Sequence, residues 1–400
     1  MIGSAMDEAF AARDAGLARA ETILSHDPGG FEQGAVVPPI YQSSLFTFPD
    51  YAAMAETFAG RGDRYIYSRG NNPTVAEFEK RIALLEGAEA ARAFSSGMAA
   101  ISGSVLAFAG AGDRILAVRH CYGDAYRFFE RLLPELGIKV DYVDGSDTKA
   151  VLAALPGAKI LYLESPSSMV FDLQDLPCLA AAARAQGIVS MIDNSWATPL
   201  FQQPLRHGVD LAIHSASKYL GGHSDTVAGV VAGSQAHVKR INERTYPYLG
   251  AKLSPFEAWL LLRGLRTLPF RLKRHEKTGR AIAERLQAHA DVMRVMHPMF
   301  SNHPGGATLL GHTGLFSFEV SDAIDVPRFA DALRFFRLGV SWGGHESLVV
   351  PALASLEQTP GVKSMSRFGV TPNTIRLHVG LEDREDLWDD LEQALAKARR

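Results

Sequence analysis

The sequence predicts an α/β protein, with a mostly parallel central sheet that carries helices on both faces and a smaller C-terminal α+β domain. Short apolar runs of β type alternate with helical stretches from residue 114 to residue 233, which is typical of a parallel sheet covered on both sides. After about residue 262, a basic helical stretch and three more β-like runs replace this alternation. The 400 residues are also too many for one compact core. We therefore expect an N-terminal arm over 1–64, a large α/β domain over 65–262 and a C-terminal α+β domain over 263–400.

Local patterns predict the individual elements. A polar helix near the start precedes the loop-like stretch 36–48, whose paired prolines oppose helix formation. Segment 74–87 spaces its apolar residues three and four apart and stops at a glycine, which predicts a helix. Small residues open a second, apolar helix within 94–108. The β-like runs are 114–118, 139–144, 159–165, 188–193, 210–215 and 227–233 in the large domain, and 314–320, 338–344 and 374–380 beyond it.

Composition excludes several classes of partner. The net charge of −3 gives no electrostatic reason to expect nucleic acid or an anionic membrane, and no apolar run approaches the roughly 20 residues of a membrane span. Cys121 and Cys178 are too few for a disulfide framework, and the start of the chain has no uninterrupted apolar core. We expect a protein of the reducing cytoplasm that binds no metal, because no HExxH motif or paired Cys/His spacing occurs.

A carboxylate ends one of the predicted strands. Ligands of open parallel sheets bind beyond the carboxyl ends of the strands, and Asp193 follows directly on the apolar run that starts at Ile188. Burying a carboxylate is costly unless a cation pairs with it. Asp193 is therefore a candidate partner for a cationic group, with a helix N-cap or a structural ion pair as the alternatives.

A lysine follows another of these strands, in the stretch HSASKYLGGHSD (214–225). Near apolar and cationic groups, a lysine such as Lys218 has a lowered pKa and forms an imine with an aldehyde. The hydroxyls of Ser215 and Ser217 can donate to a phosphate. An aldehyde, a phosphate and a ring nitrogen that pairs with a carboxylate are the attachment points of pyridoxal phosphate, which Asp193 and Lys218 together suit.

The helix predicted within 94–108 opens with Ser96, Gly97 and Met98, whose N–H groups and hydroxyl are candidate phosphate donors. Many helices begin with Ser-Gly, so this pattern alone is weak. Tyr122 follows the 114–118 strand and has a ring suited to a flat cofactor, although isolated tyrosines are more often core residues.

Arg376 lies on the predicted strand 374–380, opposite the face that carries Ile375, Leu377 and Val379. A guanidinium group there suits a substrate carboxylate, because the two pair bidentately. An ordinary salt bridge is the alternative.

From about residue 20 to residue 395, the chain resembles the Cys/Met metabolism family of fold type I pyridoxal-phosphate-dependent enzymes. The resemblance implies that fold, with an active site shared between subunits. The motifs that carry it are YSRGNNPT (67–74), SSGMAA (95–100), CYG (121–123), IDNSW (192–196), SASKYLGGHSD (215–225), GLRTL (264–268) and IRLHVGLED (375–383).

The resemblance implies a role for each matching residue. Lys218 would carry the cofactor, Asp193 would pair with its pyridinium nitrogen, and Tyr122 would stack on its ring. Tyr67 and Arg69 would reach the cofactor phosphate of a neighbouring subunit, which implies a homotetramer of two catalytic dimers. The phosphate would be held by Ser96, Gly97, Met98, Ser215 and Ser217, and the substrate by Tyr67, Ser341, Trp342 and Arg376.

Three positions bear on the reaction. Trp342 in VSWGGHESL and Ser168 in ESPSSM are similar to bacterial cystathionine β-lyases, whereas synthases and γ-lyases usually have a small or aliphatic residue at the first position. Methionine γ-lyases commonly have a cysteine where this chain has Asp124. The resemblance thus implies β-elimination of L-cystathionine to homocysteine, pyruvate and ammonia, with Lys218 and Tyr122 as catalytic residues. Lys218 would be the base, and Lys218, or as the alternative Tyr122, would protonate the departing sulfur. The resemblance gives no role to Asp124 or Val340.

Other readings stay open. A cystathionine γ-lyase, a γ-synthase, a methionine γ-lyase or an O-acylhomoserine sulfhydrylase would share the same cofactor residues. A regulator that binds the cofactor without catalysis is a more distant alternative, disfavoured because a pure binder has little need of both a base and a carboxylate clamp.

Overall fold

The computed structural model describes residues 20–26, 30–357 and 364–400. Its centre is a seven-stranded sheet in the order β1-β7-β6-β5-β4-β2-β3. Strand β7 is antiparallel to both of its neighbours, and all other pairs are parallel. The strands are β1 (Ala90–Phe94), β2 (Arg114–Val118), β3 (Lys139–Val143), β4 (Ile160–Glu164), β5 (Val189–Asp193), β6 (Leu211–Ser215) and β7 (Gly229–Gly233). The predicted fold class is confirmed, with β1 as a strand that the sequence patterns did not reveal.

Helices cover both faces of this sheet. One buried cluster joins the sheet to α5, α6, α8 and α10, and a second cluster joins the other face to α4 and α12. The helices of this part of the chain are α4 (Pro73–Glu86), α5 (Gly97–Phe108), α6 (Gly123–Glu135), α7 (Thr148–Ala154), α8 (Leu176–Ala185), α9 (Thr198–Phe201), α10 (Gln235–Arg244) and α11 (Tyr246–Leu249), with the short 3₁₀ turn η2 (Pro204–His207).

The two helices predicted before the first parallel strand are confirmed. The α4 helix begins at Pro73 after Asn72, whose side chain accepts from the Thr74 N–H, and it ends at Gly87 in the left-handed conformation with φ of 69°. The α5 helix begins at Gly97 with Ser96 as its N-cap.

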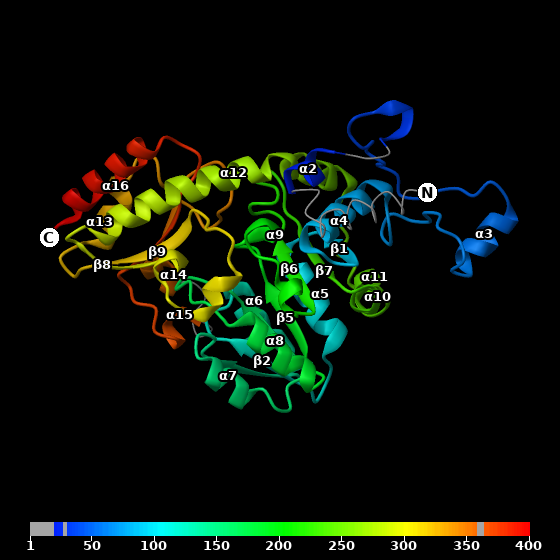
Figure 1. Ribbon diagram of the computed structural model, residues 1–400, viewed down its shortest axis with the longest axis horizontal. Helices are drawn as coiled ribbons and strands as arrows, with labels where there is room; N and C mark the ends of the chain where they lie inside the picture. Colours follow the sequence, from blue (N-terminus) through cyan, green and yellow to red (C-terminus); the bar gives the residue numbers. More distant parts are fainter. Residues whose placement is uncertain (1–19, 27–29, 358–363) are drawn as a thin grey trace.

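A smaller five-stranded sheet in the order β10-β11-β12-β9-β8 forms the C-terminal part. The α12 helix runs from the large sheet to the smaller one along one side of the molecule (Figure 1). The elements are α12 (Pro255–Gln287), β8 (Val292–Met296), η3 (Pro298–Phe300), η4 (Pro304–Thr308), β9 (Leu315–Val320), α13 (Val326–Ala332), β10 (Arg337–Leu338), β11 (Leu348–Pro351), α14 (Ala352–Glu357), α15 (Ser364–Arg367), β12 (Thr374–His378) and α16 (Arg384–Ala398). The expected domain boundary after residue 262 falls inside α12 and stays a prediction.

One predicted strand is wrong. The run 338–344 was expected to be extended, but β10 ends at Leu338 and the rest forms a loop. Gly343 adopts a φ of +87°, and a Cβ there would lie 2.6 Å from the Tyr219 nitrogen. The loop therefore packs directly on the backbone beside Lys218, which explains why a strand does not continue.

Within the N-terminal arm, the segment around α3 (Tyr51–Phe58) extends away from the rest of the molecule (Figure 1), whereas α2 (Ala20–Ser25) packs against α4 and α12. The arm also contains η1 (Glu32–Gly34), while the polar helix expected at the start of the chain falls mostly outside the described residues. Across the three described ranges, no helix combines the length and the apolar content needed to cross a bilayer.

Candidate active site

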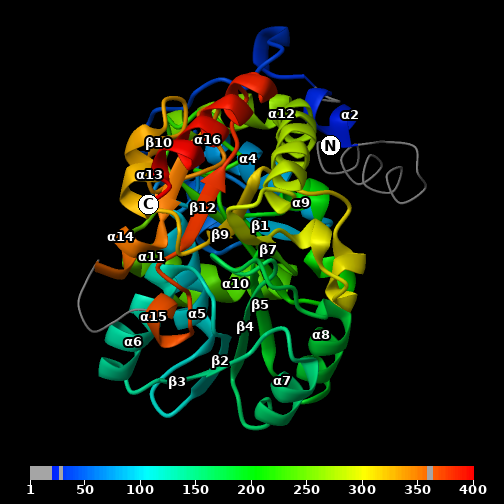
Figure 2. The ribbon, with the colours of Figure 1, turned by 90° about the vertical axis from the view of Figure 1, so that its left-hand side faces the viewer.

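A cavity of about 400 Å³ lies where β4, β5 and β6 end. These neighbouring parallel strands finish at Glu164, Asp193 and Ser215, and the ladder pairs Glu164 with Asp193. Arg376 of the smaller sheet and Ser341 and Trp342 of the loop before β11 also line this cavity. Figure 2 shows β9 and β12 of the smaller sheet above β4 and β5 of the large one. The fold thus brings functional groups to the carboxyl edge of the sheet, as expected for this architecture.

Asp193 is held by the turn that follows its strand. The Ser195 hydroxyl and backbone N–H donate to Asp193 Oδ1 at 2.6 and 3.0 Å, and the Ser195 hydroxyl accepts from the Ser215 N–H at 2.6 Å. Burial raises the pKa of Asp193. Within the described residues, no lysine or arginine forms an ion pair with it, so its carboxylate is fixed, desolvated and available to a cation.

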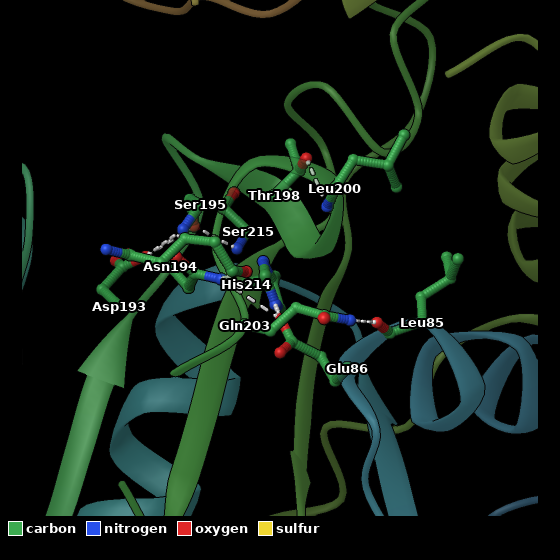
Figure 3. A network of polar contacts seen from close by, with 11 residues as sticks. Leu85, Glu86, Asp193, Asn194, Ser195, Thr198, Leu200, Gln203, His214 and Ser215 are labelled. Carbon is green, nitrogen blue, oxygen red and sulfur yellow. Dashed lines mark hydrogen bonds and ion pairs between the residues drawn. The ribbon is translucent and has the colours of Figure 1, made fainter. Parts of the chain in front are cut away.

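A buried polar network lies next to Asp193 and Ser215 at the carboxyl edge of the large sheet (Figure 3). Glu86, at the end of α4, contacts His214 Nε2 at 2.5 Å and accepts from Asn194 Nδ2 at 3.2 Å. Both partners of the first contact are completely buried. Because Asn194 follows Asp193 and His214 precedes Ser215, the network ties the ends of β5 and β6 to α4.

Lys218 lies in the turn after β6 and points into the cavity. Its Nζ donates to Ser341 Oγ at 2.6 Å and lies 5.4 Å from the centre of the Trp342 ring. Burial, reinforced by the positive charge of Arg376 and opposed by Asp193, lowers the pKa of Lys218 to about 8. A substantial fraction of this amine is therefore neutral near physiological pH, as a nucleophile or base requires.

The start of α5 lines the same cavity as Lys218. Its first N–H groups, at Gly97 and Met98, have no partner inside the helix, and a Cβ on Gly97 would lie 2.9 Å from Ser215 Cβ. The Ser96 hydroxyl accepts from the Ala99 N–H, which leaves its own proton to donate. The Ser217 hydroxyl donates to the Ala228 carbonyl at 3.2 Å and accepts from the Ala228 N–H at 2.9 Å. Small residues thus leave room for an anion at a helix N-terminus.

Tyr122 and Arg376 line the same cavity. The Tyr122 N–H donates to Glu164 Oε2 at 2.7 Å, and its side chain is 43% exposed. Arg376 projects from β12 and donates to the Val340 carbonyl at 2.7 Å. Burial lowers the pKa of Arg376 to about 10, so it remains a cation at neutral pH.

The structure brings most of the predicted site residues together and leaves two apart. Tyr67 is 49% exposed, and with Arg69 it lines a different cavity near the arm. The predicted residues that line the main cavity are Ser96, Gly97, Met98, Tyr122, Asp193, Ser215, Ser217, Lys218, Ser341, Trp342 and Arg376.

Glu164 is the residue that sequence reasoning missed. It lines the cavity, and burial together with the neighbouring Asp193 raises its pKa well above the usual range. The signal was the same as for Asp193, a carboxylate at the end of an apolar run. Burial raises the pKa of both adjacent carboxyls, and at Asp193 the two hydrogen bonds from Ser195 oppose this rise.

The donor set fits pyridoxal phosphate. A desolvated carboxylate at Asp193 suits the ring nitrogen, a lysine with a lowered pKa suits the aldehyde, and the helix start at Gly97 suits the phosphate.

Comparison with known proteins gives a consistent result. The family model described as "Cys/Met metabolism PLP-dependent enzyme" matches residues 21–396. The chain is 38% identical to the L-methionine gamma-lyase of Pseudomonas putida, covering 90% of this chain and 93% of that protein. It is also 38% identical to the cystathionine beta-lyase of Lactococcus lactis subsp. cremoris, covering 91% and 95%. A crystal structure of cystathionine gamma synthase from Xanthomonas oryzae pv. oryzae matches with a TM-score of 0.87 at 33% identity, over 95% of this chain and 98% of that one. Relatives with different activities are thus equally similar.

Proposed function

Because the chain belongs to the Cys/Met metabolism family of pyridoxal-phosphate-dependent enzymes, we propose that it is a carbon–sulfur lyase that cleaves L-cystathionine by β-elimination. With one water molecule, the products are homocysteine, pyruvate and ammonia. The observation that carries the proposal is the meeting of Lys218, Ser341, Trp342 and Arg376 in one cavity. The alternative of a regulator without catalysis is not retained, since the family consists of enzymes.

The cofactor would be held by residues of the large sheet. Lys218 would carry it, Asp193 would pair with its ring nitrogen and Tyr122 would lie against its ring. The phosphate would be bound by Ser96, Gly97, Met98, Ser215 and Ser217. When bound, the cofactor supplies an electron sink that stabilises negative charge at the substrate Cα.

The remaining groups orient the amino acid and move its protons. Arg376 binds the α-carboxylate, because its guanidinium faces the cavity and remains charged. The amine of Lys218, neutral in a substantial fraction near neutral pH, removes the Cα proton. The same Nζ then delivers a proton to the departing sulfur, so that one group serves as base and acid in turn.

The surroundings of Lys218 favour β- over γ-elimination. A γ-elimination also needs a proton to be removed from Cβ, so its base must reach two carbons. Here the Lys218 Nζ donates to Ser341 Oγ at 2.6 Å and faces the Trp342 ring. These two contacts limit the positions that the amine can reach. A base held over Cα, with the sulfur leaving from the next carbon, matches a β-lyase.

We also propose that the enzyme is a homotetramer whose sites are shared within dimers. Tyr67 and Arg69 line a cavity separate from that of their own chain's Lys218, which suits a role at a neighbour's cofactor. The nearby arm exposes large apolar side chains, with Val36 at 86% and Tyr51 at 85%. Apolar surface of this kind is typical of an interface.

The direction of elimination is tested by identifying the keto acid. The purified enzyme, loaded with pyridoxal phosphate, is incubated with L-cystathionine, and the keto acids are separated by chromatography. The proposal predicts pyruvate together with homocysteine. Accumulation of 2-oxobutyrate and cysteine would show a γ-lyase instead. The Lys218→Ala variant, loaded in the same way, serves as control and is expected to release neither keto acid.

A further inference from the structure

Asp124, to which the sequence assigned no role, contacts the phenol of Tyr122. The Tyr122 hydroxyl donates to Asp124 Oδ2 at 2.8 Å. The other oxygen, Oδ1, accepts from Arg127 Nε at 2.9 Å and also from Nη2. The carboxylate is therefore fixed between a guanidinium group and a phenol, with one oxygen for each.

This carboxylate does not serve as a helix cap. Tyr122 occupies the N-cap position of α6, and no side chain caps the helix there. Asp124 lies in the first turn, where a negative charge is favourable, but the hydrogen bonds that its carboxylate accepts come from side chains. The geometry of Asp124 thus points to Tyr122.

Tyr122 is consequently anchored at both ends. Its backbone N–H is bound by Glu164 on β4, and its hydroxyl is bound by Asp124 on α6. Glu164 lines the main cavity and Asp124 lines a neighbouring cavity, and Tyr122 lines both. The ring between them has little freedom to tilt or to swing away.

The charges around the phenol oppose its ionisation. Burial raises the pKa of Tyr122, and so do the hydrogen bond and charge of Asp124 and the charge of Asp193, while Arg127 acts in the opposite direction. The titratable and charged groups that face this ring are Asp124 and Arg127 from α6, Glu164 from β4, Asp193 from β5, Lys218 from the turn after β6 and Arg376 from β12.

We propose that Asp124 is a positioning residue that holds the Tyr122 phenol as a neutral hydrogen-bond donor in one orientation at the cavity wall. The inference deepens the proposed function and rests on it for the placement of Tyr122 against the cofactor ring. It leaves removal of the Cα proton to Lys218, because a phenol that is kept protonated and pointed at Asp124 is a poor base.

The phenol can be titrated without the cofactor. In the cofactor-free protein, tyrosinate absorbance is followed up to about pH 11 for wild type, Tyr122→Phe, Asp124→Asn and the double variant. Asp124→Asn keeps an acceptor oxygen and removes the charge, so one more phenol should ionise within this range, although burial still holds its pKa above the ordinary value. That extra phenol should vanish in the double variant. Arg127→Gln is the matched control: it breaks the ion pair of the same helical turn, and it should release no further phenol.

A second readout uses the loaded enzyme. Asp124→Asn should lower kcat/KM about tenfold, the effect of one hydrogen bond to a charged group, and should have little effect in a Tyr122→Phe background. An equal loss in both backgrounds, or an unchanged number of titrating phenols, would overturn the proposal. The phenol titration involves no substrate, so its outcome is independent of whether the enzyme forms pyruvate or 2-oxobutyrate.

Discussion

Replacing Lys218 by methionine is predicted to stabilise the cofactor-free protein at neutral pH. The pKa of this lysine is lowered from 10.5 to about 8, mainly by burial. The folded protein therefore binds the lysine proton more weakly than the unfolded chain does, and the ammonium form costs stability. At about 1.36 kcal/mol for each pKa unit, the upper bound of this cost is about 3 kcal/mol. Contact with the open cavity and with Ser341 reduces it to about 1–2 kcal/mol.

The pH dependence gives the prediction its sign. Below about pH 8, Lys218 is an ammonium in both the folded protein and the unfolded chain, so the full free-energy cost of burying this charge is present. The cost disappears as the pH rises to about 10.5, the pKa of the lysine in the unfolded chain. Thermal unfolding of the cofactor-free wild type, Lys218→Met and Lys139→Met should be compared at one protein concentration. Lys139, at the exposed start of β3, is the control.

Lys218→Met should raise the unfolding temperature by a few degrees near pH 7, and by clearly less near pH 10. The control should not show this pattern. The reasoning fails if Lys218→Met unfolds at or below the wild-type temperature near pH 7, or if its unfolding temperature rises by the same amount near pH 7 and near pH 10. Either result would show that burial does not weaken proton binding at Lys218.

Three further predictions concern the groups around Lys218. Asp193→Asn should weaken pyridoxal phosphate binding about 10- to 100-fold in an absorbance titration, because it removes a charged hydrogen-bond partner; unchanged affinity would exclude pairing with the ring nitrogen. Gly97→Ala should weaken phosphate binding about tenfold in the same titration, since its Cβ would press on Ser215 at 2.9 Å, and equal binding would contradict this. Glu86→Ala should destabilise the protein by about 1–3 kcal/mol in chemical denaturation, because it leaves His214 buried without its hydrogen-bond partner; an unchanged free energy of unfolding would contradict the importance of this pair.

The site residues that could be predicted from the sequence are those at which a charged group ends an apolar run. Asp193 and Lys218 each follow a strand that must be buried, and a charge at such a place needs a partner or a function. Glu164 follows the same rule but was missed, because the run that it ends continues into a serine and a proline. The local signal identifies the candidates, and the parallel register that pairs Glu164 with Asp193 is visible only in the fold.

Features that depend on distant contacts were not predictable. The run 338–344 was expected to be a strand, but it turns because Gly343 packs on the backbone beside Lys218. The pairing of Glu86 with His214 joins residues 128 positions apart, and neither neighbourhood indicates it. β1 was missed because its residues, AARAF, include three alanines and lack the β-branched side chains typical of strands.

The central claim, that Lys218 is the residue that carries the cofactor, can be tested directly by reducing the loaded enzyme with borohydride and mapping its peptides by mass spectrometry. Reduction makes the bond between a lysine and the cofactor permanent. The account predicts that the added mass is found on the peptide that contains Lys218, and that none is found in Lys218→Ala treated in the same way. Stoichiometric labelling of a different lysine in the wild type would contradict it.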